Sequence, residues 1–197
     1  MSHNKFIIII LLYFSSLISV HSLEADVFVQ STVNRASKIL SENISKDEKI
    51  NKLKIIAKQT VDIRGVGFYS LGQARKNLDS NQKKKYSELF ESYFLKSFSS
   101  RLAEYTDPKI RVDSQKKLNE KYTMVSSTLL ATEDKPEINI DWRVVTKDPD
   151  NPLIIDVIIE GVSLAKVQKE EFNSIIQSND GDINSLFNNL KKFVEND

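Results

Sequence analysis

The stretch Pro152–Lys166, which reads PLIIDVIIEGVSLAK, decides the fold of this chain. Its first half, Leu153–Ile159, is a run of β-favouring apolar residues that only Asp156 interrupts. Because successive side chains of a strand point to opposite sides of the sheet, apolar residues fall on both faces of this strand. Neither face can therefore lie against water. We expect one face to pack against helices and the other against protein or against something apolar that is not protein.

The residues upstream of this strand contain three more segments with the alternating pattern of a strand. These segments are 109–117, 120–131 and 137–147, and the links between them are short and polar. Two prolines mark the turn at 147–152, and the fourth strand is predicted to end at Glu160-Gly161. Four consecutive strands joined in this way predict an antiparallel meander.

The N-terminal half has the period of helices instead. Apolar residues recur at every third or fourth position over 26–44 and again over 79–105, where many of them are aromatic. Between these segments, Ser45 and Glu48 have the spacing of a capping box, so a second helix is predicted to begin there. The glycines of the stretch 61–77 are expected to let helices pack closely or to separate short turns, with Phe68, Tyr69 and Leu71 buried beside them.

The helical period returns after the fourth strand. One helix is predicted from Leu164 or Ala165, with Val167 and Phe172 among its apolar positions, and a last helix from Asp182. Helices followed by a sheet and then by helices indicate the α+β class. The chain has no internal repeat and no long linker, so residues 23–197 are expected to form a single domain.

The first 22 residues have the features of a secretory signal peptide. Lys5 precedes the apolar run Phe6–Val20, and small or tolerated residues lead up to Ser22, after which we expect cleavage. Without Lys5 the basic residues number 28 − 1 = 27, which balances the 27 acidic residues. A net charge of zero gives no general attraction for nucleic acid, so no nucleic-acid partner is expected.

The composition excludes several kinds of chemistry. The chain has no cysteine, and its only histidines, His3 and His21, lie in the segment that is expected to be removed. Thiolate and ordinary zinc sites are therefore excluded, as are Cys-His and Ser-His-Asp catalysis. Carboxylate and Ser-Lys chemistry remain. We expect no metal and no cofactor.

Three groups of residues carry a resemblance to a known family. They are Ile140-Asp-Trp-Arg143, then Ile155-Asp-Val-Ile-Ile-Glu-Gly-Val-Ser-Leu164, and then Phe172 with Ile175-Ile176 and Gly181. In these motifs and their spacing the chain resembles the MlaC family, the periplasmic phospholipid-binding component of the Mla (toluene-tolerance) ABC transport system. The likeness extends more loosely over the whole mature chain.

The resemblance implies a fold and a function. The expected fold is a helical layer packed on a curved antiparallel sheet of four or slightly more strands, NTF2-like in general shape, around a deep apolar pocket. Phospholipid tails would fill the pocket as cargo and leave the head group outside. The implied location is the periplasm. The implied partners are an inner-membrane MCE-protein/ABC transporter complex and an outer-membrane lipoprotein complex, and no catalysis is expected.

The residues expected to line this pocket are apolar and come from the aromatic helix, the last two strands and their neighbours. They are Phe68, Leu71, Phe90, Tyr93, Phe94, Phe98, Leu102, Ile140, Trp142, Ile155, Val157, Ile159, Val162, Phe172 and Ile176.

Two alternatives remain open from the residues themselves. The first is an isomerase-like enzyme with Asp141 or Asp156 as a base in an α+β pocket, since Asp156 interrupts an apolar strand. Pairing of this aspartate with a neighbouring arginine or amide is the competing interpretation. The second alternative is a periplasmic adaptor whose apolar surface binds only protein.

Overall fold

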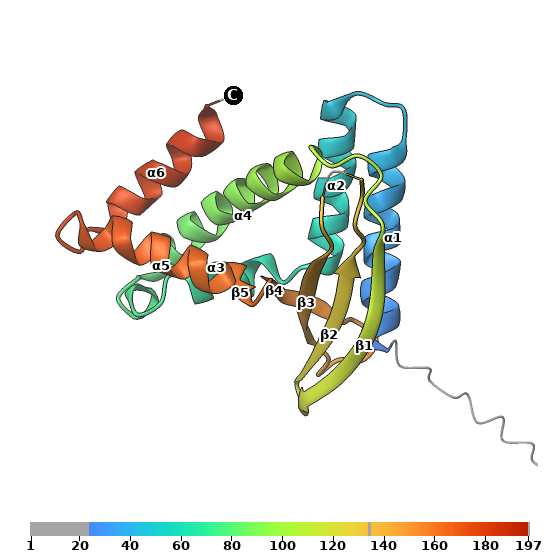
Figure 1. The fold of residues 1–197 in the computed structure, drawn as a ribbon. Helices are drawn as coiled ribbons and strands as arrows, with labels where there is room; N and C mark the ends of the chain where they lie inside the picture. The colour runs from blue at the N-terminus through green and yellow to red at the C-terminus, as the bar shows by residue number, and fades with distance from the viewer. Residues whose placement is uncertain (1–23, 134, 197) are drawn as a thin grey trace, which may run out of the picture.

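The computed structural model describes residues 24–133 and 135–196, so the predicted signal peptide at 1–22 lies outside the described residues. Helices lead, a sheet follows and two helices close the chain (Figure 1). The elements are α1 (Ala25–Ser41), α2 (Lys46–Thr60), α3 (Ile63–Ser70), the 3-10 helix η1 (Ala74–Lys76), α4 (Ser80–Leu102), β1 (Ile110–Asn119), β2 (Tyr122–Leu129), β3 (Ile138–Val145), β4 (Leu153–Ile159), β5 (Val162–Ser163), α5 (Leu164–Gln177) and α6 (Ile183–Glu195). The α+β class is confirmed.

The sheet is a curved antiparallel meander with the order β1-β2-β3-β4-β5. The predicted four strands are confirmed, and the structure adds the short edge strand β5. The chain turns at Glu160 and Gly161, which both have positive φ angles, so that Val162 pairs with Ile159. Strand β4 has a β-bulge at Ile155. Arg143 of β3 lies opposite Asp156, whereas Val144 lies opposite Ile154, so Ile155 has no partner on β3 and the register shifts there.

One face of the sheet carries an apolar row and packs partly against α1. Val125, Trp142 and Val157 lie opposite one another on β2, β3 and β4, so their side chains share this face. Helix α1 covers one end of the row and forms the first hydrophobic core with it. The buried residues of this core are Ala25, Phe28, Val29, Val33, Val125, Val144 and Ile154.

A second hydrophobic core lies among helices α3 to α6 and includes Ala57 of α2. Its aromatic centre comprises Tyr86, Phe90, Phe172 and Phe187. The rings of Phe90 and Phe172 pack edge to face, with their centroids 6.1 Å apart. Gly67 allows this packing, because a Cβ at that position would lie 2.6 Å from Phe90 Cδ1. Burial raises the pKa of the Tyr86 hydroxyl, which donates a hydrogen bond to the Gly67 carbonyl at 2.8 Å.

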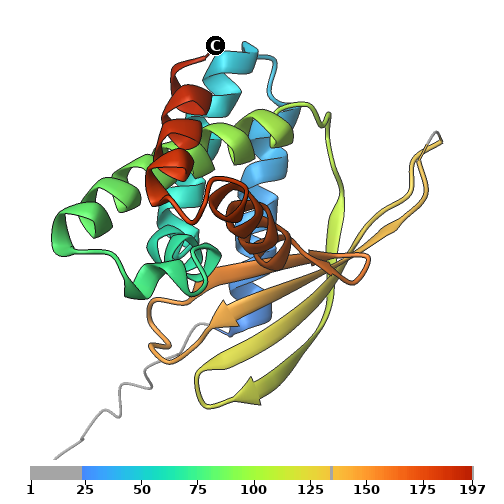
Figure 2. The same cartoon turned by 90° about the vertical axis from the view of Figure 1, so that its left-hand side faces the viewer.

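The two cores meet near the start of β4. Val61 packs against both, and it forms a parallel bridge with Ile154. The Asp62 amide donates to the Ile154 carbonyl at 3.0 Å. The helical lobe, α3 to α6, is thereby attached to the edge of the sheet and not to its centre (Figures 1 and 2).

Helices α2 and α4 begin at the predicted positions, and each starts with a capping box. Ser45 and Glu48 bond reciprocally at the start of α2, and Asp79 and Gln82 do the same at the start of α4. Helix α4 ends at Leu102, earlier than predicted, and its 23 residues make it about 35 Å long. Across the described residues, no helix combines the length and the apolar character needed to cross a bilayer.

Candidate functional site: an apolar hollow between the sheet and the helical lobe

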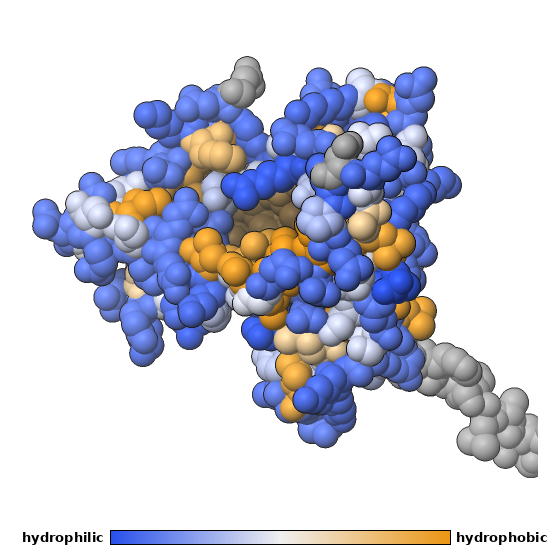
Figure 3. Space-filling view, in the orientation of Figure 1, coloured by the Kyte–Doolittle hydropathy of each residue, from blue (hydrophilic) through white to orange (hydrophobic). Residues whose placement is uncertain are grey.

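A hollow lies between α4 and the β5–α5 junction, and hydrophobic surface lines it (Figure 3). Three contacts join the segments near it. The Tyr93 hydroxyl on α4 donates to Gln168 Oε1 on α5 at 3.0 Å, and burial raises the pKa of this tyrosine. The Ala165 amide at the start of α5 donates to the Asp156 carboxylate on β4 at 3.1 Å. Beyond the end of α4, the Tyr105 ring contacts the Lys135 ammonium of the β2–β3 hairpin at 5.5 Å.

The part of the apolar row beyond α1 consists of half-buried and buried side chains. Trp142, Val157 and Ile159 are half-buried on this face, and Ile140 is buried opposite Ile159. The Trp142 indole Nε1 donates to Ser127 Oγ at 2.8 Å, and this hydroxyl in turn donates to the Ile140 carbonyl at 3.0 Å. The polar atom of the tryptophan is thus satisfied within the sheet, and its ring remains available for apolar contact.

The C-terminal half of α4 also carries half-buried apolar side chains. Phe94 and Phe98 are half-buried and stacked, with ring centroids 5.5 Å apart and an interplanar angle of 9°. Leu102 follows one turn later and is also half-buried. The side chains of Leu102, Ile140 and Ile159 belong to neither of the two cores within the described residues. Apolar side chains that are not part of a hydrophobic core are suited to contact with an apolar ligand.

Some of the predicted pocket residues lie in the helical core instead. Leu71, Phe90, Phe172 and Ile176 are almost fully buried there, and Phe68 packs against them half-buried. Their contacts are made with one another, so direct contact with a ligand stays a prediction for them. The half-buried residues Tyr93, Phe94 and Phe98 pack against this core from its outer side. Ile155, at the β-bulge, is half-buried.

The rim of the hollow includes residues that sequence reasoning missed. Val162, a predicted pocket residue, is 53% exposed, and Leu164 and Val167 beside it are 45% and 46% exposed. They form hydrophobic surface at the β5–α5 junction, where Figure 3 shows it below the hollow. The helical period places Val167 among the apolar positions of α5, and in the structure it is not among the buried residues of this helix. The spacing of Leu164 and Val167 fixes their common helix face but not whether that face is covered.

The two candidate catalytic aspartates do not point into the hollow. Asp141 follows Ile140 and Asp156 precedes Val157 along their strands, so both carboxylates lie on the face opposite the apolar row. Asp141 accepts a hydrogen bond from Ser126 Oγ at 2.6 Å. Asp156 is buried and accepts hydrogen bonds from Ser163 Oγ at 2.7 Å, from the Ala165 amide, and from Arg143 Nη1 at 3.4 Å. These bonds give both carboxylates a structural role.

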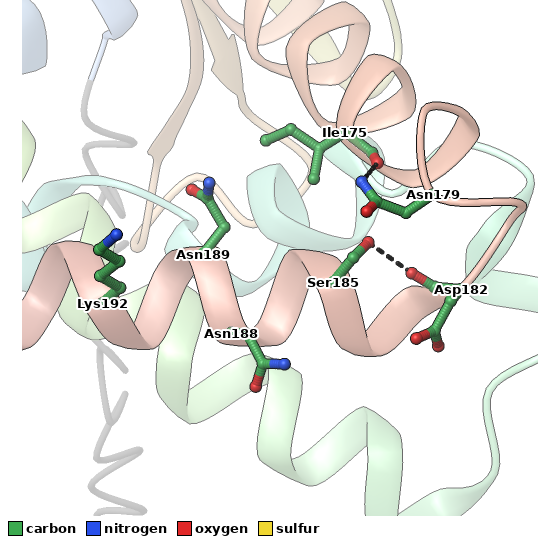
Figure 4. Close-up of a pocket in the computed structure, with 7 residues that line it drawn as sticks. All are labelled: Ile175, Asn179, Asp182, Ser185, Asn188, Asn189 and Lys192. Carbon is green, nitrogen blue, oxygen red and sulfur yellow. Dashed lines mark hydrogen bonds between the residues drawn. The ribbon is translucent and has the colours of Figure 1, made fainter.

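A second concavity, between α5 and α6, has a different character. It has a volume of about 510 Å³ and is lined mostly by polar side chains. Figure 4 shows them: Ile175, Asn179, Asp182, Ser185, Asn188, Asn189 and Lys192. Amides and charges of this kind favour water over an acyl chain. In the described part of the chain, His, Cys, Asp and Glu side chains also form no cluster that could hold a metal ion.

Comparison with known proteins adds two findings. A model of the MlaC protein family matches residues 30–192 of this chain. Among solved structures, the chain is similar to a phospholipid-binding protein from Ralstonia solanacearum in complex with a phospholipid. The TM-score is 0.72 at 18% sequence identity, and the alignment covers 87% of this chain and 97% of that chain, which shows a shared fold. No curated protein matches significantly.

Proposed function

Because this chain belongs to the MlaC family, we propose that it is an exported phospholipid carrier that holds acyl chains in the hollow between α4 and the sheet. The observation that carries the proposal is the apolar lining of that hollow. We place Trp142 and Val157 of the sheet and Phe98 of α4 in this lining, because they are partly buried and belong to separate cores. A diacyl lipid would fill the space between the cores. The Ralstonia protein, which shares the fold, forms a complex with a phospholipid, and this supports phospholipid as the cargo.

The energetics of lipid transfer explain why such a carrier needs an enclosed site. Each methylene removed from water contributes about 0.8 kcal/mol, so a tail of ~15 methylenes left in water would cost on the order of 12 kcal/mol. A protein that carries lipid across an aqueous compartment must therefore cover nearly the whole tail. Residues that are only half-buried without a ligand, such as Trp142, Ile159 and Leu102, have the surface for this contact.

The carrier would work between membranes in the periplasm. Its cargo would pass between an outer-membrane lipoprotein complex and an inner-membrane MCE-protein/ABC transporter complex, as the family implies. The sequence has no glycine-rich phosphate loop, so nucleotide energy for directional transport has to come from a partner. The enzyme alternative has no support from the hollow, since Asp141 and Asp156 lie on the other face of the sheet.

Purification of the protein from cells, followed by native mass spectrometry and organic extraction, tests the proposal. We expect phospholipid at a fixed stoichiometry. Val157→Asp and Ile159→Asp place a carboxylate in the apolar row, where it cannot be hydrated without loss of lipid contact. We expect both variants to lose the co-purified phospholipid while their circular dichroism remains that of the folded protein.

The matched control is Ile55→Asp, which introduces the same carboxylate at a position on α2 that is 57% exposed. This variant should keep its phospholipid. A wild-type protein without lipid would contradict the carrier function, and normal lipid in folded Val157→Asp and Ile159→Asp would contradict the location of the site.

A further inference from the structure

Positive charge is concentrated in one segment of this otherwise balanced chain. Between positions 64 and 85 there are six basic residues and one acidic residue, Asp79, which gives a local charge of 6 − 1 = +5, whereas the whole chain has a formal charge of +1. We call this group the basic corner. Its residues are Arg64, Arg75, Lys76, Lys83, Lys84 and Lys85.

The cations of the basic corner have no carboxylate partner within 4 Å among residues 24–133 and 135–196. The carboxylate of Asp79 is already engaged, because it accepts the Gln82 amide at the start of α4. Lysines on α2 differ in this respect, since Lys52 and Lys58 each pair with a glutamate. The corner therefore leaves its positive charge available to an external anion.

The basic corner is also held in a defined shape. Leu71 and Leu78 are buried on either side of the loop that contains η1, and the capping box fixes the first turn of α4. The Arg64 guanidinium lies 5.7 Å from the centre of the Phe68 ring, and the Lys85 ammonium lies 5.3 Å from that of Phe187. A shallow concavity of about 420 Å³ lies between α3 and α4, lined by Arg64, Ser80, Lys83, Lys84, Ser87 and Glu88.

The location of the corner separates it from the apolar hollow. It lies at the outer end of the helical lobe, away from α1 and β1 (Figures 1 and 2). The residues of α4 that we assign to the hollow lie in the other half of the helix, Phe94–Leu102. The lysines of the first two turns of α4 thus have no part in the site described above.

We propose that the basic corner docks this protein on the anionic surface of a phospholipid bilayer. Four of its six cations are lysines, which act as flexible, hydrated point charges and suit a fluid layer of phosphate groups. A fixed acidic site on a protein would favour the paired geometry of arginine. The inference rests on the proposed function, because a lipid carrier has to reach membranes. Attraction of this kind is reversible and weakens with salt, which allows the carrier to leave again.

Sedimentation of the purified full-length mature protein with vesicles tests the proposal. One set of vesicles contains phosphatidylcholine alone and the other also contains phosphatidylglycerol. We expect binding only to the second set at low ionic strength, with loss of binding near ~0.5 M salt. Lys83→Glu/Lys84→Glu should weaken this binding by on the order of tenfold or more. Glutamate in the first turns of α4 is favourable for the helix, so the variant should remain folded.

The matched control is Lys116→Glu/Lys121→Glu on the β1–β2 hairpin, which makes the same change in net charge at two exposed lysines without a carboxylate within 4 Å in the described structure. This variant should bind almost as the wild type does. Equal loss in both variants, or no binding of the wild type at low salt, would overturn the proposal. In the second case the corner would be left for an acidic protein partner.

The lipid content of each preparation, measured by mass spectrometry, separates this inference from the carrier function. Lys83→Glu/Lys84→Glu should retain its co-purified phospholipid while it loses vesicle binding. Wild-type protein that binds anionic vesicles but carries no lipid would contradict the carrier function and would still support the docking surface.

Discussion

Trp142 is the residue that connects the architecture of the sheet with the proposed site. It lies in the middle of β3, opposite Val125 on one side and Val157 on the other, and its indole NH is bonded to Ser127. A buried indole without such an acceptor would lose about 1–3 kcal/mol. With this bond, a large aromatic ring can stand at the boundary between the first core and the hollow.

Trp142 is also the only tryptophan of the chain, so its fluorescence reports on this position alone. We predict that loading the protein with phospholipid brominated on its acyl chains quenches the tryptophan emission strongly, because bromine quenches only at short range. Unbrominated lipid is the control for loading, and Trp142→Phe provides the tyrosine background. Emission that is equal with both lipids would show that the acyl chains do not reach the sheet.

At the scale of elements, sequence patterns predict where helices and strands begin but not what covers them. The capping residues at Ser45 and Asp79 are local signals, and the helices begin there as predicted. The aromatic stripe of α4 is different: Phe90 is enclosed by helices α3, α5 and α6, whereas Phe94 and Phe98 on the same helix are half-buried. Periodicity identifies the apolar side of α4. Only the packing of distant segments decides which residues on that side are enclosed in the core and which remain half-buried.

The strand β5 shows the same limit of sequence reasoning. Its two residues, Val162 and Ser163, are too few for an alternating pattern, and their pairing with β4 depends on positive φ angles at Glu160 and Gly161. The sequence predicts an end of the strand at these two residues, but the chain reverses there and pairs again. The exposed apolar surface at the β5–α5 junction follows from this reversal, and of its residues only Val162 is predicted from the sequence as part of the pocket.

Asp156 links two of these elements, β4 and α5, through a carboxylate whose side chain is 3% exposed. We predict that Asp156→Ala lowers the free energy of unfolding by roughly 2–4 kcal/mol, because the Ala165 amide and the Arg143 guanidinium lose their buried acceptor. Urea unfolding measures the change. Asp141→Ala is the control, since this half-buried carboxylate has one such partner, Ser126, and its loss should cost less. Equal effects would contradict the linking role of Asp156.

At the scale of the whole molecule, the two hydrophobic cores are joined at one edge and separated by the hollow. One core fixes α1 to the sheet, and the other holds α3 to α6 together. Val61 packs against both where the chain passes from α2 to α3. A ligand that contacts Phe98 from one lobe and Val157 from the other would join the two by apolar contact, much as a core residue does.

This arrangement predicts where lipid stabilises the protein. Because a ligand that binds only the folded state stabilises it, the lipid-loaded protein should melt several degrees above the delipidated protein. Hydrogen exchange measured by mass spectrometry should slow on loading in 94–102 of α4 and in 155–159 of β4, which form the two walls of the proposed site. Amides of α1 around Val29 and of α4 around Tyr86, which lie within one core each, should exchange at nearly the same rate in both forms. Protection that rises equally in all these segments would instead indicate that lipid acts on global stability without bridging the lobes at the hollow.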